Sequence, residues 1–441
     1  MLIAHLADTH LGKRQYHLDW REQDFYDVFT YAVEQALREH VDAIIISGDM
    51  FDTYKPPNRA IKVARDTLEK AVDKGIRIYG ILGEHDTPKT RDYPPQVLVP
   101  ELKLLGINEY MDTITKDGRT YTIAGIIHHP PTTRGLMLLK KKMRQIASRA
   151  QGKTVLMLHQ TIINFFKLER GLEIHEIPEN ISYVAMGHLH WGKLYRRSNG
   201  QLIAYPGSLE ITSADDIDEW KKSGKGFYIV DLSGDKPEAY KIDVPVTPQE
   251  RIELEYPKHR IMLAKKIPEL KRLAETGKLI IHIVLHLPRR IDVSPEAEIN
   301  QIIRRELGDM EKLYITWTRR YVGEEDEEKL EEQLEKQDPR EIERSVVSLI
   351  LADNKEPRRE HLELADTIIM LKNMLAQENY ANAQEIIEEL SKHNYWLTRI
   401  RLPQIKAVTA TKTTTSISKP QPRRTTRPRK PFRLDEFLRG G

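Results

Sequence analysis

The chain has 441 residues, enough for two or three domains, and 39% of them are hydrophobic, which is sufficient for a buried core. It contains no cysteine, so disulfide bonds and thiolate-bound zinc sites are excluded. Because the formal net charge is only +3, any nucleic-acid binding must come from local patches of charge. The start of the chain lacks a signal-peptide layout and no apolar run reaches about 18 residues. We therefore expect a soluble, cytoplasmic protein that contacts no membrane.

The first polar cluster follows an apolar strand at the start of the chain. Residues 3–14 are typical of a short strand that ends by placing Asp8 and His10 in a loop. Side chains two positions apart in an extended backbone point the same way, so a carboxylate oxygen and an imidazole nitrogen reach one spot. That combination suits a divalent metal ion, although the same pair could simply be a polar strand end.

The next two expected strands end in the same way. Amphipathic helices are predicted over 20–39 and 59–74, each followed by an apolar strand, over 41–47 and 76–82. The first of these strands leads into Asp49 and the second into Glu84 and His85. Asp49 alone could be a helix N-cap. Right-handed crossovers would place the three strand ends side by side, which favours one shared site.

Two later strands end in histidine. The strand predicted over 154–159 ends at His159, after another strand over 120–126, and the run over 183–190 carries His188 and His190. A single histidine at a strand end is more often structural, but Gly187 permits a close backbone approach to the later pair. The remaining histidines without a partner motif are expected on the surface or in the core: His5, His17, His40, His128, His129 and His175.

Seven side chains thus make up the expected site. They are Asp8, His10, Asp49, Glu84, His159, His188 and His190. Two metal ions about 3.5–4 Å apart, bridged by one carboxylate, would use this number of ligands. Nitrogen and oxygen donors without sulfur suit Mn²⁺, Fe or Zn²⁺ better than Mg²⁺. His85 is not needed as a ligand and could protonate the leaving oxygen, with Asp52 holding its ring in the right tautomer.

Taken together, these motifs resemble those of the calcineurin-like metallophosphoesterases. The motifs are Asp8-Thr9-His10, Gly48-Asp49-Met50-Phe51-Asp52, Gly83-Glu84-His85-Asp86, His159 and Gly187-His188-Leu189-His190. Further segments are similar to DNA-repair nucleases of the SbcD or meiotic-recombination-eleven type, in the archaeal form. These are Gln15-Tyr16, Arg21, Asp24-Phe25, Tyr205-Pro206-Gly207-Ser208-Leu209-Glu210 and Lys225-Gly226-Phe227-Tyr228-Ile229-Val230. The resemblance covers residues 1–245.

The resemblance implies an α/β fold, namely a metallophosphoesterase β-sandwich flanked by helices, with a small α/β capping domain and a helical C-terminal extension. It implies two Mn²⁺ ions per subunit, one held by Asp8, His10, Asp49 and His190 and the other by Asp49, Glu84, His159 and His188. His85 would act in catalysis without binding metal. The family cleaves DNA as a 3′-to-5′ exonuclease and endonuclease at double-strand breaks. The resemblance also implies a homodimer, formed through helices between residues 59 and 105, and an SMC-like coiled-coil ATPase as partner.

One position departs from the family pattern, which usually has Asn where this chain has Glu84. Two divalent ions carry four positive charges, and three carboxylates (Asp8, Asp49 and Glu84) leave a formal +1 instead of the +2 expected with Asn. We therefore expect substrate phosphate to be attracted less and the metal to be held more tightly. Activity should survive because Glu still supplies an oxygen ligand.

Beyond the phosphoesterase domain expected over 1–245, a small β-α-β unit over 246–322 should pack against it as the capping domain. Four arginines of this unit could meet DNA phosphates or remain solvated: Arg289, Arg290, Arg304 and Arg305. A charged linker is expected over 323–340. The helical region over 341–407 carries an apolar stripe, which either closes into its own bundle or docks the coiled coil of the partner ATPase.

The tail over 408–441 is rich in Thr, Pro and Arg, and is expected to be disordered and to bind DNA weakly by counterion release. It ends in an apolar peptide over 432–438 that is somewhat similar to sliding-clamp-binding peptides, but Pro431 stands where their leading Gln would be. The peptide could dock on a clamp or on another repair protein.

Two functions are compatible with the motifs. The first is a manganese-dependent DNA nuclease that hydrolyses phosphodiesters with two metal ions, in complex with the ATPase. The alternative is a phosphomonoesterase or cyclic-nucleotide phosphodiesterase on the same fold. The capping unit, the helical region and the basic tail favour the nuclease, because a small-molecule phosphatase has little use for them.

Overall fold

The computed structural model describes residues 1–322 apart from 89–91, 168, 289–293 and 309, and later residues 343–344, 347–348, 350–352, 359–376, 383–384 and 386–388. The chain divides into two compact units, Met1–Glu324 and Glu325–Gly441. Several predicted features lie outside the described residues: the linker over 323–340, the tail over 408–441 with its terminal peptide, and most of the helical region over 341–407. Arg289 and Arg290 lie outside them as well.

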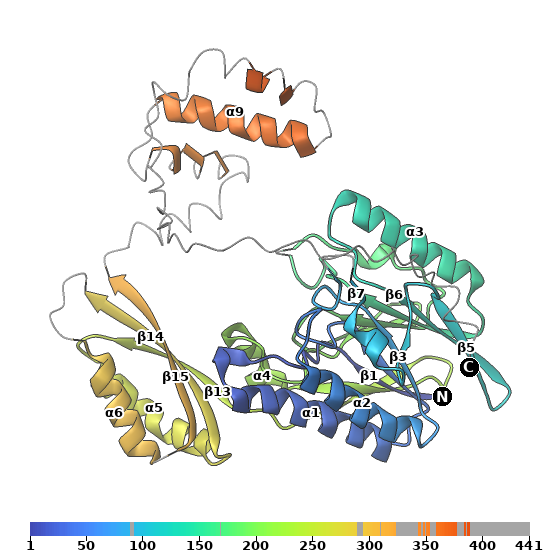
Figure 1. Cartoon of the computed structure of the whole chain (residues 1–441), viewed down its shortest axis with the longest axis horizontal. Coiled ribbons are helices and arrows are strands. Elements are labelled where there is room, and N and C mark those ends of the chain that lie inside the picture. Colours follow the sequence, from blue (N-terminus) through green and yellow to red (C-terminus); the bar gives the residue numbers. More distant parts are fainter. Residues whose placement is uncertain are drawn as a thin grey trace, which may run out of the picture. The chain divides into compact units, whose positions relative to one another are not determined.

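Two six-stranded sheets form the body of the first unit (Figure 1). The first sheet contains β1 (Leu2–Leu6), β2 (Ala43–Ser47), β3 (Arg77–Ile81), β4 (Lys103–Leu104), β11 (Gly226–Asp231) and β12 (Glu238–Asp243). The second contains β5 (Met111–Lys116), β6 (Arg119–Ile126), β7 (Lys153–His159), β8 (Tyr183–Gly187), β9 (Lys193–Arg196) and β10 (Leu202–Tyr205). Their strand orders are β12-β11-β1-β2-β3-β4 and β5-β6-β7-β8-β10-β9.

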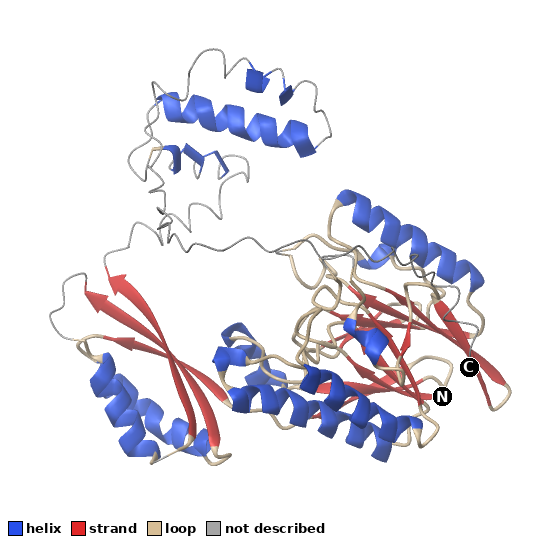
Figure 2. Ribbon diagram, in the orientation of Figure 1, coloured by secondary structure: helices blue, strands red, loops and turns tan. Residues whose placement is uncertain are grey.

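Helices cover the outer faces of both sheets, which confirms the α/β sandwich expected from the sequence (Figure 2). They are α1 (Asp19–Arg38), α2 (Asn58–Val72) and α3 (Thr133–Arg149), whereas the short α4 (Ile217–Ser223) lies against the strand Gln249–Glu255. Apolar residues of α1 and α2 share a core with the first sheet, and those of α3 share one with the second. A third core lies between the two sheets and includes Ile3, Ile45 and Val155. Strands buried on both faces explain the continuous apolar runs in the sequence.

Parallel pairing sets the position of the functional site. In the first sheet β1, β2 and β3 are parallel neighbours, and in the second sheet β6, β7 and β8 are. The carboxyl ends of parallel strands meet at one edge of a sheet, so their following loops lie together there. The helices expected over 20–39 and 59–74 and the strands expected before these loops are confirmed, with bounds shifted by a few residues.

A third, smaller sheet contains β13 (Gln249–Glu255), β14 (Lys278–Pro288) and β15 (Lys312–Val322), all parallel, with α5 (His259–Ala274) and α6 (Glu296–Leu307) against it. The prediction of a β-α-β unit over 246–322 therefore missed one strand, β13, and one helix, α5. The missed strand β13 is half exposed, and its Arg251, Glu253 and Glu255 face solvent while Ile252 and Leu254 are buried. The strand was missed because charged residues alternate with its apolar ones. The helix was missed because Pro268 lies inside α5, and proline is unfavourable in a helix interior.

In the second unit the described residues include one long helix, α9 (Arg359–Ala376). Arg344 pairs with Asp366 of α9, and Leu364 and Ala365 are buried. The choice between a self-contained bundle and a docking site therefore stays a prediction. Among the helices that the structure describes, none has the length and apolar character needed to cross a membrane.

Candidate metal centre

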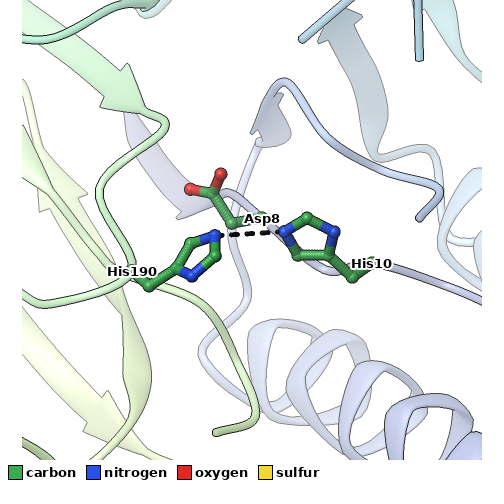
Figure 3. A group of neighbouring side chains, drawn as sticks. All are labelled: Asp8, His10 and His190. Atoms are coloured by element: carbon green, nitrogen blue, oxygen red, sulfur yellow. Dashed lines mark hydrogen bonds between the residues drawn. The ribbon is translucent and has the colours of Figure 1, made fainter. Parts of the chain in front are cut away.

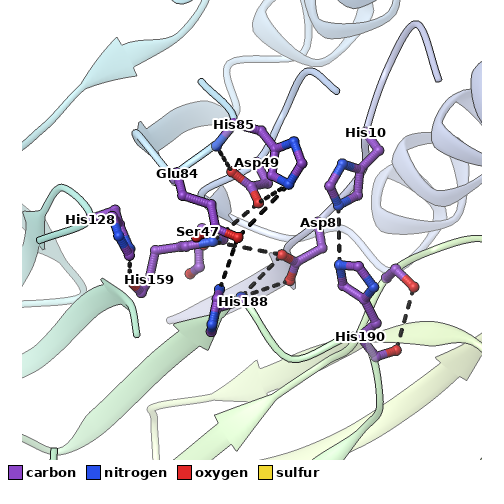
Figure 4. A network of polar contacts seen from close by, with 12 residues as sticks. Asp8, His10, Ser47, Asp49, Glu84, His85, His128, His159, His188 and His190 are labelled. Atoms are coloured by element: carbon purple, nitrogen blue, oxygen red, sulfur yellow. Dashed lines mark hydrogen bonds and ion pairs between the residues drawn. The ribbon is translucent and has the colours of Figure 1, made fainter. Parts of the chain in front are cut away.

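The predicted ligands gather where β1, β2, β3, β7 and β8 end (Figure 4). Their donor atoms form overlapping groups within 4.8 Å: Asp8 with His10 and His190, Asp8 with Asp49 and His159, and Asp49 with Glu84 and His85. Since Asp8 and Asp49 each belong to two groups, the three form one continuous cluster. His188 joins it as well, because its backbone N–H donates to both carboxylate oxygens of Asp8 at 3.0 and 3.1 Å.

Glycines at the strand ends make this convergence possible. A Cβ on Gly83 would lie 2.1 Å from Oδ1 of Asp49, and a Cβ on Gly48 would lie 2.2 Å from Nδ1 of His159. Gly48 also has a φ of +89°, a conformation that other residues rarely adopt. Any larger residue at either position would displace a predicted ligand.

The cluster also contains backbone strain. Asp8, His10, Asp49 and His188 have φ values of 50°, 44°, 47° and 93°, in the left-handed region that non-glycine residues seldom occupy. Backbone hydrogen bonds hold the first two loops in register, since the N–H of Asp8 donates to Gly48 and that of His10 to Asp49, both at 3.1 Å. Strain of this kind is concentrated at functional sites, where surrounding contacts maintain it.

Two imidazole nitrogens face each other on one side of the cluster (Figure 3). Nδ1 of His10 lies 3.2 Å from a carboxylate oxygen of Asp52, and Nδ1 of His190 lies 2.6 Å from the hydroxyl of Thr212, which itself donates to Asp216. The hydrogen bond with Thr212 places the Nδ1 proton of His190 outward. Nδ1 of His10 forms no hydrogen bond among the described residues, but the nearby Asp52 carboxylate favours a proton there, so both Nε2 atoms can present lone pairs. The two Nε2 atoms are 3.2 Å apart. Two nitrogens at right angles around one metal ion, with bonds near 2.0–2.1 Å, would be about 3 Å apart.

A second group of side chains brings the buried His159 close to two carboxylates. His159 is fully buried and donates through Nδ1 to the carbonyl of Ser47 at 2.8 Å, which leaves Nε2 3.3 Å from Asp49 and 4.0 Å from Asp8. Nε2 has no hydrogen-bond partner among the described residues. Burial opposes a charge on His159, but Asp49 and Asp8 raise its pKa to about 10. Burial raises the pKa of Asp8, whereas His159 outweighs burial at Asp49 and lowers its pKa.

His85 stands at the open side of the cluster, with 41% of its side chain exposed. Its Nδ1 lies 2.9 Å from the backbone carbonyl of Asp52, and its Nε2 lies 3.8 Å from Glu84 and 4.0 Å from Asp49. Asp52 thus meets His85 through its main chain. The Asp52 carboxylate contacts His10 and Lys13 instead, and these lower its pKa to about 2 against the effect of burial.

Two residues near the cluster were missed. His128, which was left without a partner, donates through Nδ1 to the carbonyl of His159 at 3.1 Å, and its ring centre is 6.1 Å from that of His188. It follows the end of β6 as His159 ends β7, so the strand pattern contained a signal. Glu169 lies 3.1 Å from Nε2 of His188 and accepts the hydroxyl of Thr161 at 2.7 Å. Glu169 follows no strand end, and the sequence carried no signal for it.

The donor set fits divalent cations. It combines carboxylate oxygens and imidazole nitrogens without sulfur, a close contact between Nε2 of His10 and Nε2 of His190, and a buried Nε2 without a hydrogen-bond partner on His159 among the described residues. A divalent cation would accept lone pairs from the imidazole nitrogens and would offset the negative charges of the carboxylates. The outer partners Asp52, Thr212 and Ser47 hold the rings in the tautomers that a metal requires.

Comparison with known proteins agrees with this geometry. Residues 1–192 match the family model described as calcineurin-like phosphoesterase, and this range includes all seven predicted ligands. The DNA double-strand break repair protein Mre11 of Sulfurisphaera tokodaii is 36% identical over 311 residues, which cover 68% of this chain and 77% of that protein. The chain belongs to the Mre11 family.

Other Mre11 proteins show similar values. The Mre11 of Methanocaldococcus jannaschii is 35% identical over 257 residues, covering 58% of this chain and 67% of that protein. The Mre11 of Thermoplasma acidophilum is 34% identical over 303 residues, covering 68% and 79%. The family assignment and the fold expected from the sequence motifs are confirmed.

Proposed function

We propose that this Mre11-family chain is a DNA nuclease that hydrolyses phosphodiesters with two Mn²⁺ ions per subunit and processes the ends of double-strand breaks. The observation that carries the proposal is the buried cluster described above, whose imidazole nitrogens and carboxylates converge closely enough to share divalent cations. The DNA-repair name of the relatives supports DNA as the substrate. Both 3′-to-5′ exonuclease and endonuclease action are part of the proposal.

The proposed ligands divide between two ions. Asp8, His10, Asp49 and His190 would hold one ion, and Asp49, Glu84, His159 and His188 the other, with Asp49 shared. When bound, such a pair of ions activates water and neutralises charge developing on the phosphate. The protein contributes the rigidity of the arrangement. Backbone bonds between the first two loops and fixed imidazole tautomers hold the donors in place before substrate arrives.

His85 is the proposed proton donor to the leaving oxygen. Its Nδ1–H donates to the carbonyl of Asp52, so Nε2 faces the open side of the cluster, and in the imidazolium form Nε2 would carry the proton that passes to the leaving oxygen. Its exposure lets a substrate reach it, whereas the buried His159 is closed off. A histidine that is fixed at one nitrogen and exposed at the other is suited to transfer a proton.

Further parts of the proposal concern partners. We propose residues 1–245 as the phosphoesterase domain and 246–322 as a DNA-capping domain, with 341–407 binding the coiled coil of an SMC-like ATPase. Homodimerisation and docking of the C-terminal peptide on a sliding clamp or another repair protein complete it. Co-purification of the chain with a long coiled-coil ATPase would support the proposed ATPase partner, and its absence from the purified complex would count against it.

The substitution His85→Ala tests the reaction. We expect Mn²⁺-dependent DNA cleavage to fall by about 10²–10⁴-fold, because a general acid contributes on this scale. Metal content measured by inductively coupled plasma mass spectrometry should stay unchanged, since His85 is not among the proposed ligands. His175→Ala, at a 73% exposed histidine that pairs with Glu173 and is not a proposed ligand, is the matched control and should cleave normally. If the wild-type protein hydrolyses nucleotide monophosphates or cyclic nucleotides but no DNA with any metal, the alternative phosphatase function replaces this one.

A further inference from the structure

A cavity of about 540 Å³ adjoins the metal centre, and the residues of the proposed reaction do not fill it. It is lined by Pro131, Thr133, Leu136, Ile163, Asn164, Lys167, Glu169, Arg170 and Gly171. Its volume falls within the range of sites that hold small organic ligands, about 300–1,000 Å³. We call it the side cavity.

Glu169 connects the side cavity to the metal centre. This residue lines the cavity, and its carboxylate lies 3.1 Å from Nε2 of His188, a proposed metal ligand. The hydroxyl of Thr161 donates to the same carboxylate at 2.7 Å and fixes it in place. A substrate group in the cavity would therefore lie one side chain away from the ligand shell.

The walls combine apolar surface with unused polar groups. Leu136 and Ile163 are half-buried and present apolar surface. Oδ1 of Asn164 accepts the backbone N–H of Ile174 at 3.0 Å, which leaves its amide nitrogen free to donate. Within the part of the chain that the structure describes, Lys167 and Arg170 form no ion pair, although both are exposed at the cavity. The cavity thus offers apolar contact, one amide donor, two cations and, on the side of the metal centre, the carboxylate of Glu169.

We propose that the side cavity holds the base of the nucleotide next to the scissile phosphodiester, an inference that rests on the proposed nuclease function. A nucleobase is a flat apolar body with hydrogen-bond acceptors on its edge, which matches the apolar walls and the Asn164 amide. Its nucleotide carries phosphates on either side, which match Lys167 and Arg170. Apolar contact favours no particular base, so the site positions the strand without reading its sequence.

A cavity-filling pair of variants tests this inference. Leu136→Trp would fill the side cavity, whereas Leu138→Trp adds the same ring to a 40% exposed position of the same helix outside the cavity. The measurement is kcat/KM for single-stranded DNA with Mn²⁺, divided by that for bis(p-nitrophenyl) phosphate, which carries no base. We expect this ratio to fall at least tenfold in Leu136→Trp, through a higher KM for DNA, and to stay at the wild-type value in Leu138→Trp.

Abasic oligonucleotides identify the occupant. A wild-type enzyme that seats a base should lose about tenfold in kcat/KM when the nucleotide next to the cleaved bond is abasic. Leu136→Trp should show no additional loss of kcat/KM with that substrate, because the tryptophan side chain already fills the side cavity. Should Leu136→Trp fail to fold by circular dichroism, Thr133→Trp, at an exposed wall position, replaces it in the same comparison.

The outcomes separate the two proposals. A wild-type protein that cleaves no DNA overturns the proposed function itself. The proposal that the side cavity holds a base is wrong if the wild type cleaves DNA but both tryptophan variants have the same kcat/KM ratio. It is also wrong if the abasic substrate lowers kcat/KM as much in Leu136→Trp as in the wild type. Lowered affinity of Leu136→Trp for an acidic peptide, with unaltered DNA kinetics, would assign the cavity to a protein partner instead and also overturn the inference.

Discussion

Two buried charged clusters in the first unit differ in how their polar atoms are satisfied. Around Arg21, which is fully buried, each charged group meets complementary partners. Its guanidinium donates to Gln15 at 2.9 Å, Asp24 at 2.7 Å and the carbonyl of Ile211 at 3.2 Å, and lies 3.3 Å from Glu210. In the metal centre, by contrast, Nε2 of His159 has no hydrogen-bond partner among the described residues, and the Nε2 atoms of His10 and His190 face each other.

The partners of the Arg21 cluster show what it does. Asp24 accepts the hydroxyl of Thr247 at 2.8 Å and pairs with Lys278, which begins β14. Glu210 accepts the backbone N–H groups of Ile211 and Thr247. The cluster therefore joins the sandwich to the third sheet, and its complete pairing is that of a structural element. Burial of charge alone does not distinguish a functional site. The metal centre differs because its unmatched Nε2 of His159 lies among converging carboxylates and imidazoles.

The largest expected effects come from a matched pair of isosteric substitutions, Asp8→Asn and Asp24→Asn. Asp24→Asn removes charge from a satisfied pair and leaves Arg21 under-compensated, so the melting temperature should fall by roughly 10 °C. Asp8→Asn should cost at least about 100-fold in DNA cleavage. It should not lower the melting temperature of metal-free protein, because burial already raises the pKa of Asp8 and disfavours its charge. A large loss of stability in Asp8→Asn would break the comparison.

The next effect concerns the carboxylate behind His188. Glu169→Ala removes the acceptor for Nε2 of His188, so Mn²⁺ affinity measured by isothermal titration calorimetry should fall about 10–100-fold. Glu169→Gln should retain most of the affinity, since its amide oxygen still accepts a hydrogen bond. Glu179→Ala, at an exposed carboxylate paired with Arg197, serves as the control. Equal affinities in all three variants would remove Glu169 from the metal centre.

A smaller effect is the pH dependence of metal-free protein. The folded-state pKa of His159 is raised from 6.5 to about 10, so the imidazolium stabilises the fold fully below pH 6.5. That contribution is lost as pH rises through 10, and the melting temperature in EDTA should fall by several degrees between these values. Saturating Mn²⁺ should reverse the slope, because metal binding requires the neutral imidazole. A flat profile in EDTA would show that no imidazolium compensates the carboxylates.

The smallest expected effect is that of Glu84→Asn. Replacing a carboxylate ligand by an amide raises the formal charge of the loaded site by one unit. We expect a few-fold weaker Mn²⁺ affinity together with a few-fold lower KM for DNA, and little change in kcat. A variant whose metal affinity rises, or whose KM for DNA increases, would contradict the electrostatic account of this position.

Much of the metal centre could be predicted because its motifs are local. Asp8 and His10 lie directly after one strand and His188 and His190 after another, so the strand pattern alone brought their side chains to the sheet edge. The same logic would have included His128, which follows β6, a parallel neighbour of β7. The carboxylate role of Asp52 could not be predicted, because its contact with His10 depends on how two loops cross.

The sequence by itself determined the strands and helices around the site and the polar residues that follow those strands, because periodicity and strand ends are properties of short segments. The motif resemblance to a known family added the sandwich fold. Only the tertiary structure decided the position of Glu169 behind His188, the pairing of Arg21 with partners up to residue 211, and the side cavity. These depend on contacts between segments far apart in the chain, whose mutual placement is set by the packing of both sheets and their helices.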